Sequence, residues 1–538
     1  MNLLAISGRH ADASAALSVD GRLIAAASEE AFVRVPRVGY AGTRGFPAQS
    51  VAACLRRAGL EPQAIDRVEV VNDGWSQRDN HNGPGSVWPG AFNGRVKNQA
   101  VDAVLADAWQ TAITARADVV LVCGTDPPGM AAFSVNGREL VPRPCERENG
   151  VRLRAAARLV AGRMGLASTD PLGAVDRASV GGEPVFVEEL SGALAWRDPS
   201  ALLVDLDRLA SWIDAAAGEH AGQLTEAESL NIRIQQTRRD IAASFVCRLA
   251  EVLGSATERV AALTGASKVG IGGAVFANAR LNTELRQRLG DDIALSLVPE
   301  PPGRVLGAVL SASGHASDGM PNLGVGPSFT EADIKAALDN CRLDYIFEPD
   351  WPRLLKRVSR LLSQGKVVAW FHGAMGFGPR AAGTRSILCD PSGRYARQNM
   401  NDYLRRVPLD EPLPVVFAPS RAAECLVRPV SPLWSAIDAA VRPECRPQLA
   451  GALDWRGCVR VHGTNGDQAP ALRDLLELHA ADAGVPALIE TNLCAPGEPT
   501  ACTPRDAIRT VYSSAIDVLV MDRFVLMKDH WLLRADAE

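Results

Sequence analysis

The pattern of apolar and polar positions predicts strands at the start of the chain. Apolar runs at 3–7, 13–19 and 22–30 are separated by a polar loop and by the pair Asp20-Gly21. An Asp-Gly pair between two apolar runs is typical of a tight hairpin turn. We therefore expect three strands, of which the last two form a β-hairpin.

Strand and helix patterns continue to alternate beyond the hairpin. Apolar positions recur with helical spacing in 47–60, 100–115 and the long segment 227–254, while continuous apolar runs at 66–71, 117–124 and 268–273 predict strands. Residues 72–98 are rich in Gly, Asn, Pro and Trp and are interpreted as a loop or lid. No internal repeat is evident, and the alternation predicts α/β domains.

The length and one polar segment predict how the domains are divided. A chain of 538 residues exceeds one ordinary core, so two or three domains are expected. The segment 314–334 is polar and rich in Gly and Pro. We place a first domain at 1–320, a linker at 321–340 and a second domain at 341–538.

Composition narrows the classes of function. The 57 Lys and Arg residues against 62 Asp and Glu residues give a formal net charge of −5, which argues against a dedicated nucleic-acid-binding protein. No 18-residue apolar run predicts a membrane span, and the first ten residues do not resemble a signal peptide. The 11 cysteines form no C-x-x-C pair, so we expect reduced thiols in a cytoplasmic protein rather than disulfides or a zinc site.

The stretch 366–391 places glycines and two arginines between two apolar runs. Two interpretations are open at this point. In the first interpretation, backbone N–H groups and arginines form an anion-binding loop. The other is a glycine-rich turn with two surface arginines.

Five segments, in the same order, resemble the O-carbamoyltransferases of the NodU and antibiotic-tailoring type. They are 6–35, 162–168, 272–282, 377–391 and 484–508. The resemblance implies an N-terminal TsaD-like, actin-type ATPase fold followed by a YrdC-like α/β domain. In that family the YrdC-like domain joins ATP and carbamoyl phosphate into carbamoyl-adenylate. The TsaD-like domain then passes the carbamoyl group to an acceptor, using a bound metal.

The resemblance and the residue chemistry together indicate ligand-binding candidates. Lys366, Arg380, Arg385 and Ser386 are expected to face a phosphate, because arginine and lysine hold such charge well. The pair Gly272-Gly273 is expected to let a nucleotide lie against the backbone, with Asn278 and Asn282 nearby. The alternative for the glycines is a strand-to-helix turn that needs a positive φ.

Departures from the family pattern affect the catalytic candidates. Ala11 stands where the family has a hairpin histidine, which leaves His10 and Asp12 as the catalytic candidates beside it. His372 stands where the family has glutamine. It is either an acid–base group or a structural histidine.

The metal ligands of the family are replaced in this chain. Ala103, Asp107, Cys123 and Pro301 occupy their four positions, so we expect no metal of the family kind. The alternative is a replacement site, and the residues available for it are Asp107, Cys123, Asp126 and Glu300.

The second domain also departs from the pattern. Ala374 and Gly376 replace an arginine and a glutamate, Glu490 replaces an asparagine, and 408–416 carries no cation where the family has a basic cluster. Three functions therefore remain open. The chain is an ATP-dependent carbamoyltransferase acting on a hydroxyl or amine of a small natural product, a degenerate partner subunit of a conventional carbamoyltransferase, or another ATP-dependent acyl transferase or ligase. An oligomer is expected in each case.

Overall fold

The computed structural model describes most of the chain. The described residues are 1–9, 11–40, 46–72, 97–124, 130–137, 139–143, 150–166, 171–197, 201–221, 227–290, 293–295, 303–313, 323–378, 380, 383–428, 430, 436–462 and 469–528. The predicted loop at 72–98 falls almost wholly outside them.

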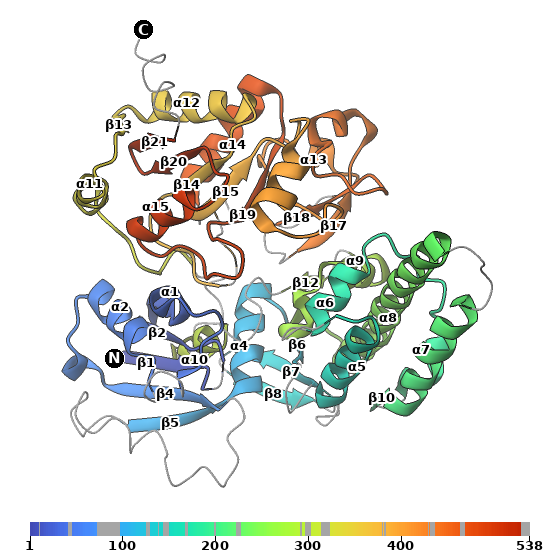
Figure 1. Cartoon of the computed structure of the whole chain (residues 1–538). Coiled ribbons are helices and arrows are strands. Elements are labelled where there is room, and N and C mark those ends of the chain that lie inside the picture. The colour runs from blue at the N-terminus through green and yellow to red at the C-terminus, as the bar shows by residue number, and fades with distance from the viewer. Residues whose placement is uncertain are drawn as a thin grey trace.

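The N-terminal half contains two five-stranded sheets (Figure 1). The first has the order β3-β2-β1-β4-β5 and the second the order β12-β11-β6-β7-β8. The strands of the first are β1 (Asn2–Ser7), β2 (Ser14–Val19), β3 (Arg22–Ser28), β4 (Arg67–Asn72) and β5 (Lys97–Asp102). Those of the second are β6 (Val119–Cys123), β7 (Met130–Asn136), β8 (Glu139–Arg143), β11 (Val269–Gly272) and β12 (Ile293–Leu295).

The hairpin predicted at the start of the chain is confirmed. β1 pairs antiparallel with β2, and β2 with β3, and the turn residues Asp20 and Gly21 have φ values of 49° and 80°. The first of these angles is tolerated by aspartate and the second suits glycine. The Asp-Gly pair therefore fixes the register between the ends of β2 and β3, where Val19 faces Arg22.

The two sheets repeat one topology, which corrects the expectation of no internal repeat. In each, the first strand of the unit pairs antiparallel with the second, the second with the third, and the first runs parallel to the fourth, which runs parallel to the fifth. The repeat is structural and leaves no trace in the sequence. This duplicated unit is the architecture expected of an actin-type ATPase fold, so the predicted fold class is confirmed.

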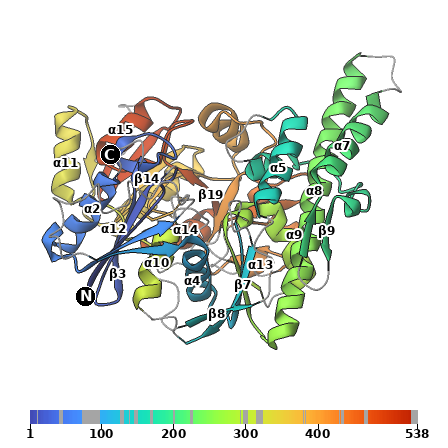
Figure 2. The same cartoon turned by 90° about the horizontal axis from the view of Figure 1, so that it is seen from below.

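Helices cover both sheets and extend beyond them. α8 is the longest, and with α7 it projects from the body (Figure 2). A small pair of strands, β9 (Leu194–Arg197) and β10 (Ala201–Val204), lies beside α8. The helices of this half are α1 (Glu30–Val33), α2 (Ala48–Ala58), α4 (Ala103–Ala115), α5 (Gly150–Arg163), α6 (Pro171–Ala178), α7 (Leu206–Ala221), α8 (Ala227–Thr264), α9 (Ala279–Leu289) and α10 (Arg304–Ser313).

The C-terminal half is built on a nine-stranded sheet of order β13-β21-β20-β14-β15-β19-β16-β18-β17. Its strands are β13 (Ile346–Phe347), β14 (Val368–Phe371), β15 (Arg385–Cys389), β16 (Pro414–Phe417), β17 (Ile437–Ala440), β18 (Cys458–Val461), β19 (Ala487–Asn492), β20 (Val518–Met521) and β21 (Phe524–Met527). The helices are α11 (Glu331–Asn340), α12 (Trp351–Ser363), α13 (Ala422–Cys425), α14 (Pro470–Ala483), α15 (Pro504–Tyr512) and a π-helical turn (Gln398–Arg405).

Apolar side chains join the C-terminal sheet to the second lobe of the N-terminal half. α12 and α14 cover one face of the sheet, packing on Trp370 and Leu388. The opposite face belongs to a continuous buried cluster that also contains residues of α8 and β6. Burial of this shared surface favours a fixed arrangement of the two halves.

The segment expected to be a linker is partly helical, since α11 occupies 331–340 and buries Ile334 and Leu338. Before α11, residues 323–327 pair with the glycine-rich loop that follows β14. Phe377 N donates to Leu323 O at 2.8 Å, and Met375 N donates to Pro327 O at 2.9 Å. The linker therefore holds the loop of the 366–391 stretch.

Two further findings bear on the cysteines and on membranes. Cys425 and Cys445 form a disulfide, so the expectation that no cysteine is paired is wrong for these two. They lie 20 residues apart with a Cα–Cα distance of 5.5 Å, a pairing that spacing alone did not reveal.

In the described part of the chain, no helix is both long and apolar enough to cross a bilayer.

A buried row of hydrogen-bonded side chains connects α12, α14 and the residue after β15. It predicts how the stability of the protein depends on pH. Ser359 Oγ lies 2.9 Å from His479 Nδ1, and His479 Nε2 lies 3.3 Å from Asp390 Oδ2. Burial opposes ionisation of Asp390, but hydrogen bonds from His479 and Ser392 outweigh it and lower its pKa.

A carboxyl group with a lowered pKa contributes stability above the ordinary aspartate pKa, and the contribution is lost as pH falls through the folded-state value. We expect Asp390→Asn to lower the free energy of unfolding at pH 7 by about 2 kcal/mol. Urea unfolding should show the wild-type advantage shrinking below about pH 4. An advantage that does not change with acidification would contradict this account.

Candidate functional site

Four basic side chains gather in the C-terminal half, and we call them the cationic cluster: Arg380, Arg405, Arg460 and His462. Arg380 lies in the loop between β14 and β15, Arg405 ends the π-helical turn, and Arg460 lies in β18. His462 follows β18, on the same face as Arg460 because side chains alternate along a strand. The positive charges of all three arginines act on the ring of His462.

Carboxylates hold two of these arginines. Arg405 donates to Glu411 Oε1 at 2.9 Å and to Asn401 Oδ1 at 2.7 Å. Arg460 donates to Asp438 Oδ1 at 3.0 Å and to Asp176 Oδ2 at 3.2 Å. Asp176 lies in α6, so Arg460 also joins the C-terminal sheet to the N-terminal half.

The third arginine, Arg380, is different. Among the described residues, its guanidinium makes no hydrogen bond or ion pair. Burial lowers the pKa of Arg380 to about 10, while the charge of Glu490 acts in the opposite direction. The group remains a cation at neutral pH with its donors available to a ligand.

Glu490 stands behind Arg380 and is held by two donors. Ser386 Oγ donates to Glu490 Oε1 at 2.6 Å, and Gly383 N donates to the same oxygen at 2.8 Å. Burial raises the pKa of Glu490 more than these bonds and Arg380 lower it. Ser386 therefore positions a carboxyl group, and its hydroxyl is already used by that group.

His462 provides a neutral group beside the arginines. Burial and then the charges of Arg380, Arg460 and Arg405 lower its pKa well below the ordinary value. A neutral imidazole can donate or accept a hydrogen bond without adding to the positive charge. The cluster can thus bind phosphate oxygens through arginine and offer a neutral base beside them.

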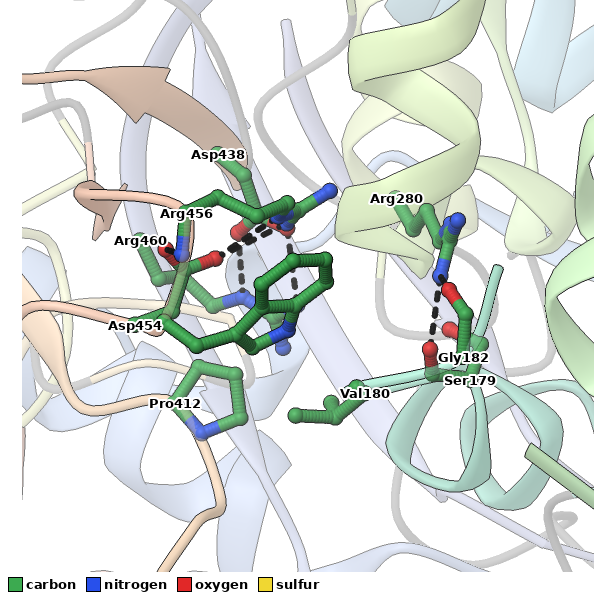
Figure 3. A pocket seen from close by; sticks show the side chains of 11 residues that line it. Ser179, Val180, Gly182, Arg280, Pro412, Asp438, Asp454, Arg456 and Arg460 are labelled. Carbon is green, nitrogen blue, oxygen red and sulfur yellow. Dashed lines mark hydrogen bonds and ion pairs between the residues drawn. The ribbon is translucent and has the colours of Figure 1, made fainter. Parts of the chain in front are cut away.

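A small pocket lined by residues of both halves opens next to the cluster. Figure 3 shows one wall formed by Asp438, Arg456 and Arg460 and the other by Arg280 with Ser179 and Gly182. Arg280 Nη1 donates to the carbonyls of Ser179 at 2.6 Å and Gly182 at 3.1 Å. Arg460 therefore belongs both to the cationic cluster and to this pocket.

Two predicted anion ligands have other roles. The guanidinium of Arg385 is fully buried, donates to the carbonyls of His372 at 3.1 Å and Gly373 at 3.0 Å, and stacks 3.6 Å from the Phe371 ring centre. It holds its own loop in place, which corrects its assignment as a phosphate ligand. Lys366 precedes β14, whereas Arg380 follows it, so the length of the strand separates them, and Lys366 pairs with Asp517 at 3.7 Å.

The glycine pair at the end of β11 is explained by packing. A Cβ at Gly272 would overlap the Thr111 hydroxyl, and one at Gly273, whose φ is +109°, would overlap the Cys123 carbonyl. Contacts within the protein therefore explain why both positions are glycine, in agreement with the alternative of a strand-to-helix turn that needs a positive φ.

Asn278 and Asn282 are engaged within the chain. Asn278 Oδ1 accepts from Leu281 N at 2.7 Å and caps α9. Asn282 Nδ2 donates at 2.9 Å to the carbonyls of Phe276 and Ala436, the second of which lies in the C-terminal half. Of the two predicted nucleotide ligands, Asn278 therefore caps a helix, and Asn282 bonds the N-terminal half to the C-terminal half.

Asp12 and His372 make their contacts away from the cationic cluster. His10 lies outside the described residues, and Asp12 pairs with Arg37 at 2.8 Å. His372 Nδ1 lies 2.6 Å from Asp522 Oδ1, with the ring against Trp351 and 29% of the side chain exposed. His372 remains a candidate acid–base group, oriented by a carboxylate.

Comparison with known proteins relates the C-terminal half to a family. Residues 359–528 match the family model described as the carbamoyltransferase C-terminus. This part of the chain is therefore similar to the C-terminal part of carbamoyltransferases. All four members of the cationic cluster lie inside the matched range.

Relatives at low identity agree with this assignment. The nodulation protein NolO of Bradyrhizobium diazoefficiens is 27% identical, covering 54% of this chain and 55% of that protein. The 3'-hydroxymethylcephem-O-carbamoyltransferase of Amycolatopsis lactamdurans is 27% identical over 33% of each. The chain thus spans about half the length, or less, of the curated relatives it matches.

Among solved structures, the activator of 2-hydroxyisocaproyl-CoA dehydratase from Clostridium difficile aligns with 59% of this chain and 96% of its own. Its sequence identity is 14% and the TM-score is 0.34. The N-terminal fold is identified here from its duplicated sheet topology and not from that alignment.

The cluster contains residues that the linear pattern did not single out. The segment 408–416 carries no cation, but Arg405, which lies before it, reaches the cluster from the π-helical turn. For Arg460 and His462 a signal was available, since period-two alternation in 458–462 puts both on one face. Which residues face them from elsewhere in the C-terminal half is decided only by the folded sheet.

The metal candidates are partly described. No three His, Cys, Asp or Glu side chains come together as a metal site within the described ranges. Asp126, Glu300 and Pro301 lie outside those ranges, so the replacement site built from Asp126 and Glu300 stays a hypothesis.

Asn282 provides a test of its structural role. We expect Asn282→Ala to lower the free energy of unfolding by about 2 kcal/mol, because two buried carbonyls lose their donor. Binding of ATP, measured by calorimetry on the folded variant, should be unchanged. Loss of ATP binding at unchanged stability would instead restore Asn282 as a nucleotide ligand.

Proposed function

We propose that this chain is an ATP-dependent carbamoyltransferase whose cationic cluster binds the phosphate groups of ATP and of a carbamoyl donor. One observation carries the proposal: Arg380 has donors without a hydrogen-bond partner among the described residues, inside the range that matches the carbamoyltransferase C-terminus. A sheltered cation of this kind needs a counter-charge, and a phosphate supplies it.

The neighbours of Arg380 suit this role. Arg460 is fixed by carboxylates, and its positive charge acts on Arg380. Arg405 is fixed by Glu411, and its charge acts on His462. Ser386 and Gly383 both donate to one oxygen of Glu490, so part of the negative charge of this carboxyl group is directed away from a ligand at Arg380. Neutral His462 is suited to accept a proton or a hydrogen bond from the bound ligands.

In the proposed reaction, water first cleaves carbamoyl phosphate into carbamate and inorganic phosphate. A carbamate oxygen then attacks the α-phosphate of ATP, which forms carbamoyl-adenylate and releases pyrophosphate. An acceptor hydroxyl or amine on a small molecule then takes the carbamoyl group and AMP leaves. The name of the Amycolatopsis relative, which refers to O-carbamoyl transfer on a hydroxymethylcephem, supports a hydroxyl acceptor. The role of the arginines is positioning and charge stabilisation, which is the largest contribution in phosphoryl chemistry.

Pyrophosphate release tests the proposal. The purified chain should release pyrophosphate only when ATP, Mg²⁺ and carbamoyl phosphate are all present. Arg380→Ala should reduce the rate by about 100-fold, as expected for removing one strong charge-stabilising donor. The exposed Arg394 offers a matched control, and Arg394→Ala should leave the rate unchanged. Equal rates in the wild type and Arg380→Ala would remove the basis of the proposal.

A second function, as a partner subunit, is favoured by one observation in the N-terminal half. Ala103 and Asp107 stand at positions where the family resemblance implies metal ligands, and Asp107 is already paired with Arg304 at 3.3 Å. A chain that has lost this site could complete a conventional carbamoyltransferase as its partner.

For the partner function, we expect a stable complex with a conventional homologue in size-exclusion chromatography and no pyrophosphate release by this chain alone. Pyrophosphate release by a monodisperse preparation that forms no such complex would contradict it.

A further inference from the structure

The contact between α4 and α10 lies where the family resemblance implies a metal ion. Ala103 and Asp107 are four residues apart on α4, so they lie on one face, one turn apart. The structure allows a test of whether these residues and their surroundings fit an ion.

The two helices approach too closely to leave space for a metal and its ligands. A Cβ at Gly307 of α10 would overlap the carbonyl of Ala106 on α4. A Cβ at Gly303, directly before α10, would overlap the side-chain amide of Gln110. The helix α10 therefore packs at Gly307 directly against the backbone of α4, and the buried Ala103 offers no side-chain ligand.

Asp107 already has a cationic partner at this contact, while its second oxygen, Oδ1, has no hydrogen-bond partner among the described residues. Arg304 Nε donates to Asp107 Oδ2 at 3.3 Å, and the two side chains are 7% and 3% exposed. A guanidinium stays protonated in proteins, so it presents a permanent positive charge to Asp107. A divalent cation in the same place would meet that charge at short range in a poorly solvated region.

We infer that the Arg304 guanidinium takes the place of a metal cation at the contact between α4 and α10. The N-terminal half thus holds its buried aspartate with a cation of the protein and binds no metal there. This inference does not depend on the proposed carbamoyl transfer, because it concerns metal content and stability alone.

The pairing of Asp107 with Arg304 limits the catalytic chemistry of the N-terminal half. Activation of an acceptor hydroxyl by a metal held on α4 is not available to this chain. The ion pair instead joins the helix that follows β5 to the one that follows the second sheet, and so fixes the two lobes of the N-terminal half to each other. Arg304 is a positioning residue in this arrangement.

Metal content is the first part of the test. The full chain is stripped with a chelator, incubated separately with Zn²⁺, Mn²⁺ and anaerobic Fe²⁺, desalted and analysed by mass spectrometry of the metals. We expect far less than one equivalent of each and no shift in Tm. One equivalent that disappears in Asp107→Asn would overturn the inference. One equivalent that disappears in the double variant Asp126→Asn/Glu300→Gln would also overturn it, in favour of a replacement site.

Stability of variants is the second part. Arg304→Met leaves Asp107 buried without its counter-charge and should lower Tm clearly. The double variant Asp107→Leu/Arg304→Met removes both charges and should recover most of the loss, because an apolar pair of similar volume often substitutes for a buried ion pair. Arg208→Met, at an exposed arginine, should leave Tm unchanged. Equal Tm values for the wild type and Arg304→Met would contradict the assigned role of Arg304.

Discussion

The ion pairs of Arg460 connect the main parts of this molecule. Its guanidinium bonds Asp438 in the neighbouring strand and Asp176 in the N-terminal half, and its side chain is 11% exposed. Removing either carboxylate would leave a sheltered charge without compensation, which is costly in a protein interior. The position of the C-terminal sheet on α6 and the position of the cationic cluster are therefore set by the same side chain.

The two halves of the chain have kept different kinds of chemistry. In the C-terminal half, arginines from a loop, a π-helical turn and a strand converge around a neutral histidine. In the N-terminal half, α10 packs at Gly307 against the backbone of α4, and Arg304 pairs with Asp107 where the family resemblance implies a metal ion. The first arrangement leaves donors for a ligand, whereas the second pairs its buried aspartate with an arginine of the protein.

Turn residues and apolar periodicity in the sequence predicted many of the strands and helices, whereas the order of the strands in the sheets depends on contacts between distant segments. The Asp20-Gly21 hairpin, the strand ending in Gly272 and the long helix beginning at 227 follow from turn chemistry and periodicity. The duplication of the sheets could not be predicted, because topology repeats here without sequence similarity.

The site was only partly predictable for the same physical reason. A motif does not tell whether an arginine turns toward a ligand or toward its own loop, and Arg385 does the latter. Strand direction separates Lys366 from Arg380, although they are close in sequence. Arg405 and His462 are far apart in sequence and meet only because of the strand order.

A crystal structure of the chain with carbamoyl phosphate and a non-hydrolysable ATP analogue would test the central claim most directly. The account predicts phosphate density in contact with the Arg380 guanidinium, within the cluster that includes Arg405 and His462. Density for the nucleotide against Gly272 and Gly273 alone, with no phosphate at Arg380, would contradict it.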